Sequence, residues 1–319
     1  MAQQKINLSI LSIVLFACTI IFILNLADGT LVTNDQNSES SLLNTPPVEP
    51  KDNVNKITAI NTQKSKIMLE ESDRKNGQMV VMHRPDWKFD VQLITQFEKL
   101  KSTAENGNIE ANYIIAMNLR YCFNSPTDEI AFEKRLEQAY EFSDSSQAVE
   151  RITEKYQYCS GIEKKQRNQF YTYLKTAANN EYIAAQEAFG EIPSKFFMES
   201  QGYENLEREK FITIRDNFIE QKIKFLEQAA QHGSIKALIR LSTMNRSQRF
   251  GENGYVNSFA YNQLILALTQ SNETYNRYAW LQQKQRSQLT LDEVDAANSI
   301  SAQWLEIIKT NGTLYLNGN

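Results

Sequence analysis

The chain has 319 residues, enough for a tether plus one domain of about 200 to 230 residues with a sizeable core. Its 34 Lys and Arg against 38 Asp and Glu give a formal net charge of −4, and no clustered basic stripe follows the chain, which argues against nucleic-acid binding. Only 11 Gly and 6 Pro occur, too few for the turns of a strand-built sandwich or barrel, so the composition predicts an all-α fold.

The first predicted element is a transmembrane helix over residues 6–26, within an N-terminal membrane anchor at residues 1–27. These 21 residues carry no charge, and as a helix they would be about 31 Å long, enough to cross the apolar core of a bilayer. Lys5 precedes the segment and the next cation is Lys51. Because positive charge favours the cytoplasmic side, we expect a single-pass protein of the bacterial inner membrane with its C-terminal domain in the periplasm.

Two alternatives to an uncleaved anchor involve processing. Leu15-Phe16-Ala17-Cys18 is similar to a bacterial lipoprotein box, in which Cys18 would be lipidated and become the new N-terminus. Phe16 is bulky for that box, and the residues after Cys18 stay apolar. Cleavage as an ordinary secretory signal would need small residues that Asn25-Leu26-Ala27 supplies poorly. The uncleaved anchor is therefore the prediction, with lipidation at Cys18 as the alternative.

Residues 28–86 are interpreted as a flexible linker because Asn, Ser, Thr, Asp and Pro dominate much of this segment. Near its end, Pro85 disfavours helix at the preceding residue, and Asp86 can cap a following helix. The folded domain is therefore expected to span residues 87–319.

Three segments of that domain align without gaps: Leu100–Ala111, Leu174–Ala185 and Leu226–Ala237. In each, a Leu and an Ala four residues apart share one helix face, a Gly or its substitute ends the helix in a left-handed cap, and Ile and Ala begin the next helix. Each unit is therefore a predicted helical hairpin, whose small Ala lets two helix axes approach closely. The expected packing residues are Leu100, Ala104, Gly107, Ala111, Leu174, Ala178, Ala185, Leu226, Ala230, Gly233 and Ala237.

The spacing of the units indicates stacked helical pairs. The offsets are 74 and 52 residues, and a degenerate copy at Leu136-Glu-Gln-Ala139-Tyr140 lies near the midpoint of the longer one. We therefore expect four units, one of them eroded, with an insertion near residues 196–223. Such an array is an α/α solenoid of stacked helical hairpins.

These units resemble the Sel-one-like subfamily of tetratricopeptide-type repeats, whose members carry a Leu, an Ala-Ala pair, a Gly and a following Ala at this spacing. The unit at residues 225–241 fits best, whereas Glu181 replaces the cap glycine in the unit before it. Residues 278–281 and 289–304 also resemble the closing helices of such proteins. Over residues 87–308 the resemblance implies a tetratricopeptide-like solenoid that serves as a protein-binding scaffold.

Two of the three cysteines, Cys122 and Cys159, fall in the predicted exported domain. Each follows a tyrosine near the end of a predicted helix, so neighbouring hairpins would bring them together. An even pair in an oxidising compartment favours a disulfide, with two buried thiols as the alternative.

No catalytic, cofactor-binding or metal-binding residue is predicted. His83 and His232 are the only histidines, one before the repeats and one in a turn. Phosphate-binding loops, HExxH motifs, nucleophile elbows and cysteine pairs at metal spacing do not occur in the sequence. The chain is therefore expected not to be an enzyme.

The predicted function is a membrane-anchored periplasmic scaffold that binds an envelope or membrane protein through its concave surface. The alternative is recognition or modification of cell-wall glycan, for which paired carboxylates in a cleft would be the signature of catalysis. A third hypothesis is a purely structural role within an envelope assembly. The sequence predicts no oligomeric state.

Overall fold

The computed structural model describes residues 79–142, 146–247 and 253–317, all within the compact unit Ala59–Asn319. The predicted span at residues 6–26, Cys18 and most of the predicted linker lie outside the described residues. Within the described part of the chain, no helix combines the length and the apolar character needed to cross a membrane.

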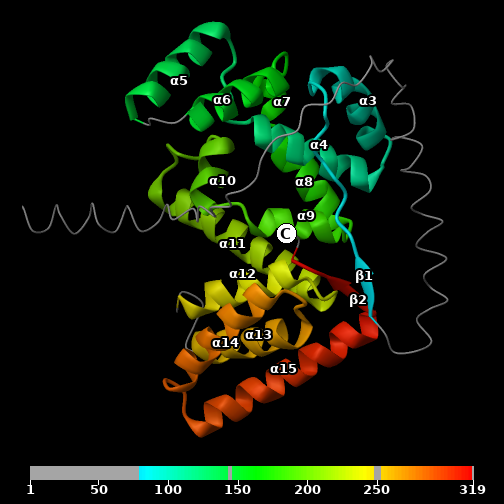
Figure 1. Ribbon diagram of the computed structural model, residues 1–319, viewed down its shortest axis with the longest axis vertical. Coiled ribbons are helices and arrows are strands. Elements are labelled where there is room, and N and C mark those ends of the chain that lie inside the picture. Colours follow the sequence, from blue (N-terminus) through cyan, green and yellow to red (C-terminus); the bar gives the residue numbers. More distant parts are fainter. Residues whose placement is uncertain (1–78, 143–145, 248–252, 318–319) are drawn as a thin grey trace, which may run out of the picture. The chain divides into compact units, whose positions relative to one another are not determined.

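The described residues are mainly helical, and helices joined by short turns form hairpins (Figure 1). In chain order, the elements are β1 (Val80–Met82), α3 (Ile94–Glu105), α4 (Ile109–Cys122), α5 (Glu129–Phe142), α6 (Ser146–Cys159), α7 (Lys164–Arg167), α8 (Phe170–Asn179), α9 (Ile183–Gly190), α10 (Ser194–Ser200), α11 (Arg208–Gln231), α12 (Ile235–Arg246), α13 (Gly254–Leu268), α14 (Asn272–Arg286), α15 (Leu291–Asn311) and β2 (Thr313–Tyr315).

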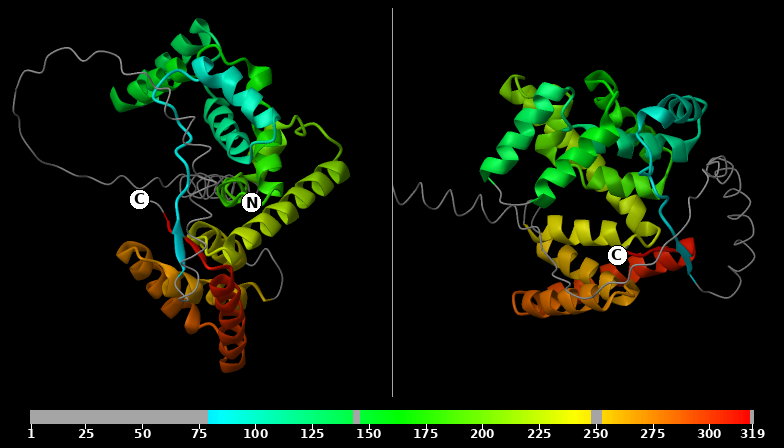
Figure 2. Two further views of the ribbon diagram at one scale, coloured as in Figure 1. Left: turned by 90° about the vertical axis from the view of Figure 1, so that its right-hand side faces the viewer. Right: turned by 45° about the horizontal axis from the view of Figure 1, so that its top comes forward.

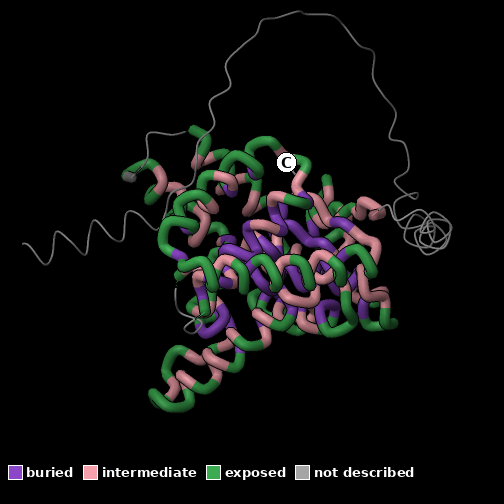
Figure 3. Tube along the Cα trace, turned by 90° about the horizontal axis from the view of Figure 1, so that it is seen from below, coloured by how far each residue is buried: buried purple, intermediate pink, exposed green. Residues whose placement is uncertain are grey.

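The hairpins stack because the second helix of one pair packs on the first helix of another: α4 on α8, α9 on α11, and α12 on α13. The apolar side chains at these contacts form the core, which includes Phe97, Leu119, Phe170, Leu174, Phe189 and Leu226. Figure 3 shows that the buried parts of the chain (purple) lie toward the interior and the exposed parts (green) on the outer sides of the helices. The predicted helical fold is confirmed.

The same turn joins the helices of the three aligned units. At the first turn, Gly107 N donates to Ala104 O and Asn108 N to Thr103 O, and the equivalent pairs of bonds recur at residues 181–182 and 233–234. The left-handed residue of this turn is Gly107, Glu181 or Gly233, with φ of +88°, +60° and +72°. These bonds satisfy the last carbonyls of the first helix, so the turn is a Schellman motif.

The residue after the left-handed position caps the second helix in two of the units. The Asn108 side chain accepts from Ala111 N at 2.8 Å, and Ser234 Oγ accepts from Ala237 N at 3.0 Å. Tyr182 stands at this position in the remaining unit and makes no side-chain cap bond. The unit without the cap glycine therefore also lacks the capping side chain.

The predicted boundary between linker and domain at residue 87 is wrong, because residues 79–86 belong to the fold. Val80–Met82 forms β1, which pairs in parallel with β2 at Thr313–Tyr315. In the left view of Figure 2, the extended chain that carries β1 (cyan) meets the C-terminal strand (red). The pairing was not predicted because its two strands lie at opposite ends of the described chain.

The degenerate unit near Leu136 is a hairpin of α5 and α6. Helix α5 packs chiefly against α6, and Leu136 and Ala139 are only half-buried. This hairpin lies at the edge of the helical array (Figure 1). Most of the predicted insertion at residues 196–223 is helical, since it contains the end of α10 and much of the 24-residue helix α11.

Candidate binding cleft beside the disulfide

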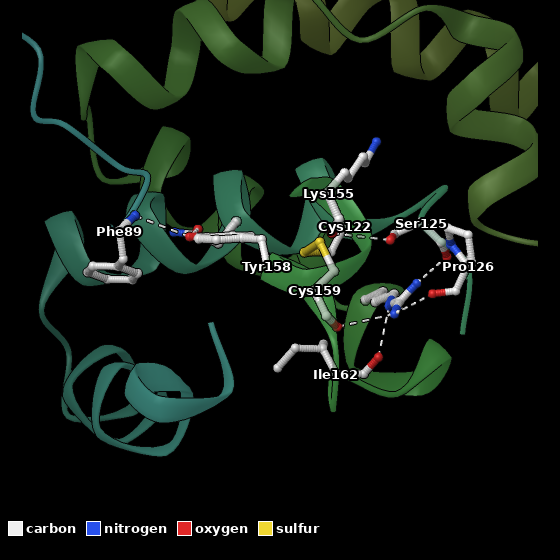
Figure 4. The surroundings of a disulfide bond; sticks show 10 residues. Phe89, Cys122, Ser125, Pro126, Lys155, Tyr158, Cys159 and Ile162 are labelled. Atoms are coloured by element: carbon white, nitrogen blue, oxygen red, sulfur yellow. Dashed lines mark hydrogen bonds between the residues drawn. A yellow bond between two sulfur atoms is a disulfide. The ribbon is translucent and has the colours of Figure 1, made fainter. Parts of the chain in front are cut away.

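A disulfide joins Cys122, the last residue of α4, to Cys159, the last residue of α6. Both cysteines are completely buried. Figure 4 shows the sulfur–sulfur bond between Cys122 and Cys159, with Ser125, Pro126 and Ile162 of the following loops nearby. The expected disulfide is therefore present, and it fixes the edge hairpin α5–α6 to the α3–α4 hairpin.

The buried side chain of Arg167 on α7 holds the two loops beside the disulfide. Its Nε donates to Ile162 O at 2.8 Å and its Nη2 to Cys159 O at 3.3 Å. The same guanidinium donates to Ser125 O and Pro126 O in the loop between α4 and α5. Arg167 is 2% exposed, and burial lowers its pKa. Backbone carbonyls thus serve as its partners in place of a carboxylate.

An open cleft of about 1090 Å³ lies next to this junction. Its lining comes from the loop after α4, one face of α5, helix α7 and the end of α10. The lining residues are Phe123, Asn124, Ser125, Pro126, Thr127, Ala131, Lys134, Arg135, Gln138, Lys164, Arg167, Asn168, Glu199, Ser200, Gln201 and Gly202. Arg167 therefore holds together two of the segments that line the cleft, the loop after α4 and helix α7, next to the disulfide.

The cleft is basic although the chain as a whole is acidic. Its lining carries the cations Lys134, Arg135, Lys164 and Arg167 and the single carboxylate of Glu199. The pKa of the nearby Lys155 is lowered by burial and then by the charges of Arg135 and Arg167. Cations that crowd one another in this way favour an anionic ligand.

The segment that enters the domain is anchored on the other side of the disulfide. Tyr158 donates its hydroxyl proton to Asn118 Oδ1 and accepts from Phe89 N at 3.2 Å (Figure 4). Asn118 Nδ2 in turn donates to Trp87 O at 2.6 Å. Residues 87–89 are thereby tied to α4 and α6.

The predicted packing residues build the frame of the fold and do not line the cleft. Among the eleven, all except Gly107 are buried, and Gly107 lies in an exposed turn. The cleft residues were missed because they come from separate segments. The available signal was the charge pattern of Lys134-Arg135 and Lys164-Lys165 around the two cysteines.

Of the two histidines, His83 follows β1 and His232 follows α11. His232 caps the end of α11, and its Nδ1 lies 3.3 Å from Thr313 Oγ1. Burial lowers the pKa of His232. Within the described residues, no group of three or more His, Cys, Asp or Glu side chains could hold a metal ion.

A second polar cluster surrounds Glu187, a buried carboxylate on α9. Arg84 Nε and Nη2 donate to its two oxygens at 2.5 and 2.7 Å, and Ser234 donates its hydroxyl proton to Oε1. Arg84 also donates to Leu316 O. Burial opposes the charge of Arg84, but the bonds and charge of Glu187 raise its pKa. Through these contacts, Arg84 and Leu316, near the two ends of the described chain, are linked to helix α9 in its middle.

Comparisons with known proteins give one structural neighbour. No protein-family model matches the chain, and no curated protein matches it. A protective antigen present in uropathogenic Escherichia coli strains, described as displaying an SLR fold, is similar at 16% sequence identity with a TM-score of 0.35. The match covers 69% of this chain and 42% of that chain, so the chain spans less than half the neighbour's length.

Proposed function

We propose that the chain is a membrane-anchored periplasmic scaffold that binds another protein of the envelope. The observation that carries the proposal is the open basic cleft, which a disulfide and a buried arginine hold in shape on a helical frame. Stacked helical hairpins of this kind offer preformed surfaces for protein ligands.

Two features support the compartment. The uncharged segment at residues 6–26 is long enough to span a bilayer. The Cys122–Cys159 disulfide supports export, because structural disulfides form and persist mainly in oxidising compartments. A tether at the membrane would also raise the effective concentration of the domain near partners in the envelope.

The charge of the cleft defines the chemistry of the partner. Lys134, Arg135 and Lys164 are exposed at the rim, whereas Glu199 alone carries negative charge in the lining. A polypeptide segment rich in Asp and Glu complements this surface, and the complementarity would act on association rate and specificity.

Recognition of cell-wall glycan is the second candidate, supported by uncharged hydrogen-bonding side chains in the same lining. These are Asn124, Ser125, Thr127, Gln138, Asn168, Ser200 and Gln201. The single carboxylate Glu199 does not supply the acid and base pair that a glycosidase uses. This cleft therefore supports glycan binding more than glycan hydrolysis.

Co-purification from living cells tests the proposal. A tagged full-length chain is crosslinked in cells, purified from solubilised membranes and compared with a tag-only control. We expect one protein partner in near-stoichiometric amount, and loss of most of it in the double variant Lys134→Glu/Arg135→Glu. The matched control Arg208→Glu/Lys210→Glu reverses two exposed charges on α11 outside the cleft. Recovery of cell-wall material alone would support glycan recognition instead.

A further inference from the structure

A second group of cations lies on different helices, at the carboxyl end of α9. Arg120 of α4 donates to Ala188 O at 3.1 Å, and Lys222 of α11 donates to Ile192 O at 2.8 Å. Arg240 of α12 is close enough to Lys222 to affect its titration. Carbonyl oxygens at the end of a helix lack intrahelical partners and carry partial negative charge, so they attract cations.

The positive charge in this cluster exceeds what its surroundings neutralise. Lys222 is only 4% exposed, and its pKa is lowered to about 8 by burial and then by the charges of Arg240 and Arg120. Glu191 is the carboxylate that opposes these charges. Among the described residues, no carboxylate lies within ion-pair distance of Arg120, Lys222 or Arg240. Buried cations are ordinarily paired, and this departure needs an explanation.

Hydrogen-bond donors are also left over. Arg240 Nε is buried without a hydrogen-bond partner. The Lys222 ammonium has three N–H groups and, within the described chain, one hydrogen-bond acceptor, Ile192 O. Native structures leave few buried donors unsatisfied, and a missing ion or ligand is one recognised reason. Arg120 and Arg240 are half-buried and Glu191 is exposed, so these outer members of the cluster are accessible to solvent.

We propose that Arg120, Lys222 and Arg240 form a binding site for a carboxylate group that a partner polypeptide supplies. The unused donors of Lys222 and Arg240 can serve the two oxygens of one carboxylate, while Arg120 adds charge. The proposal rests on the protein-binding function proposed above and gives the partner a second, sharper requirement: an Asp, a Glu or a free C-terminus that reaches the end of α9.

Binding at this site is linked to pH. A carboxylate favours the charged form of Lys222, so the proton that this residue tends to lose near pH 8 is retained when the ligand is bound. Affinity should therefore be highest below the pKa of free Lys222 and should fall as the pH rises through it. The other charged groups that act on Lys222 are Arg240, Arg120 and Glu191.

The test uses the purified full-length chain in detergent and two capped tripeptides, acetyl-Ala-Glu-Ala-amide and its Gln counterpart. NMR titration at neutral pH gives their dissociation constants. We expect the Glu peptide to bind about tenfold more tightly than the Gln peptide, and Arg240→Gln and Lys222→Met each to weaken it about tenfold. The controls Lys236→Gln and Lys224→Met change cations on the same two helices and should leave the affinity within about twofold.

Three results would overturn the site: equal affinity for the two peptides, equal loss in the control variants, or inorganic phosphate at equal ionic strength binding more tightly than the Glu peptide. If Lys222→Met fails to fold, Arg240→Gln decides. Co-purification separates this inference from the function on which it rests. If wild type and Arg240→Gln recover the same partner equally, the carboxylate site is contradicted and the scaffold function still stands. If no partner is recovered at all, the scaffold function itself is contradicted.

Discussion

At Gly233 the backbone has φ of +72°, and a Cβ atom there would lie 2.5 Å from the carbonyl oxygen of Thr313. The turn of the third repeat therefore serves two purposes: it ends α11 and it receives β2. Tyr315 N donates to Gly233 O at 3.1 Å in the same contact. Gly107 has φ of +88°, and a Cβ atom there would have nothing within 4 Å. Glycine is therefore favoured at position 107 by the left-handed backbone conformation and not by a close contact.

These two glycines allow a matched comparison. Gly107→Ala should lower the free energy of unfolding by about 1 kcal/mol, because only the left-handed conformation opposes the new side chain. Gly233→Ala should cost roughly 1 to 3 kcal/mol more, since the methyl group also meets backbone that cannot move aside. Urea denaturation of both variants measures the difference. Equal losses would show that β2 does not press on this turn.

The titration of Lys222 makes the free energy of unfolding depend on pH, in a direction that follows from its pKa. Its pKa is lowered in the folded chain to about 8 from an ordinary value of 10.5. Between these values the unfolded chain holds more protons at this residue than the folded chain. Stability from this group is therefore lowest below pH 8 and rises as the pH increases.

The expected contribution is a slope of up to about 1.4 kcal/mol per pH unit in the free energy of unfolding. Denaturation of wild type and Lys222→Met between about pH 7.5 and 9.5 tests it. The difference between the two proteins should shift steadily in favour of wild type as the pH rises. Parallel curves would mean that Lys222 titrates normally.

Among the elements, the α5–α6 hairpin depends most on covalent attachment, because α5 packs chiefly on α6. The disulfide joins residues 37 positions apart and ties α6 to α4. Replacement of both cysteines with alanine should lower the free energy of unfolding by about 3 to 4 kcal/mol. Limited proteolysis should then cut first within residues 126–157. Unchanged protection of that segment in the double variant would contradict this account.

The elements that could be predicted are those with local signals. The Schellman turns and caps arise from residues within a few positions of one another, such as Ala230, Gly233 and Ser234, so three of the hairpins could be predicted from one alignment. Contacts between distant residues left no such pattern. Arg84 contacts Glu187 and Leu316, which lie 103 and 232 positions away, and β1 was therefore assigned to a linker.

The binding cleft also combines a feature that the sequence predicts locally with features that depend on contacts between distant residues. Pairing of Cys122 with Cys159 followed from their places at two helix ends. The residues around Arg167 do not predict its role, yet it donates to carbonyls on both sides of the disulfide. Its role depends on how two loops meet, which the order of residues does not encode locally. The basic pairs Lys134-Arg135 and Lys164-Lys165 are visible in the sequence, but that three of these residues line one cleft depends on how the loops are placed.

At the scale of the whole described unit, the Arg84–Glu187 ion pair closes the N-terminal segment onto the repeats. Glu187 is 4% exposed and Arg84 is 17% exposed at the side chain. Arg84→Met leaves a buried carboxylate uncompensated and should cost roughly 3 to 5 kcal/mol. The double variant Arg84→Met/Glu187→Gln should recover more than about 1 kcal/mol of that loss. Additive losses in thermal or chemical unfolding would show that the two groups do not interact energetically.

The central claim is that the basic cleft contacts a protein partner in the envelope. Site-specific photo-crosslinking in living cells tests it most directly, with the reactive residue at Gln138 in the cleft lining or at Glu141, exposed on the same helix outside the lining. The account predicts one discrete protein adduct from position 138 and little from position 141. Equal labelling from both positions, or no protein adduct from position 138, would contradict it.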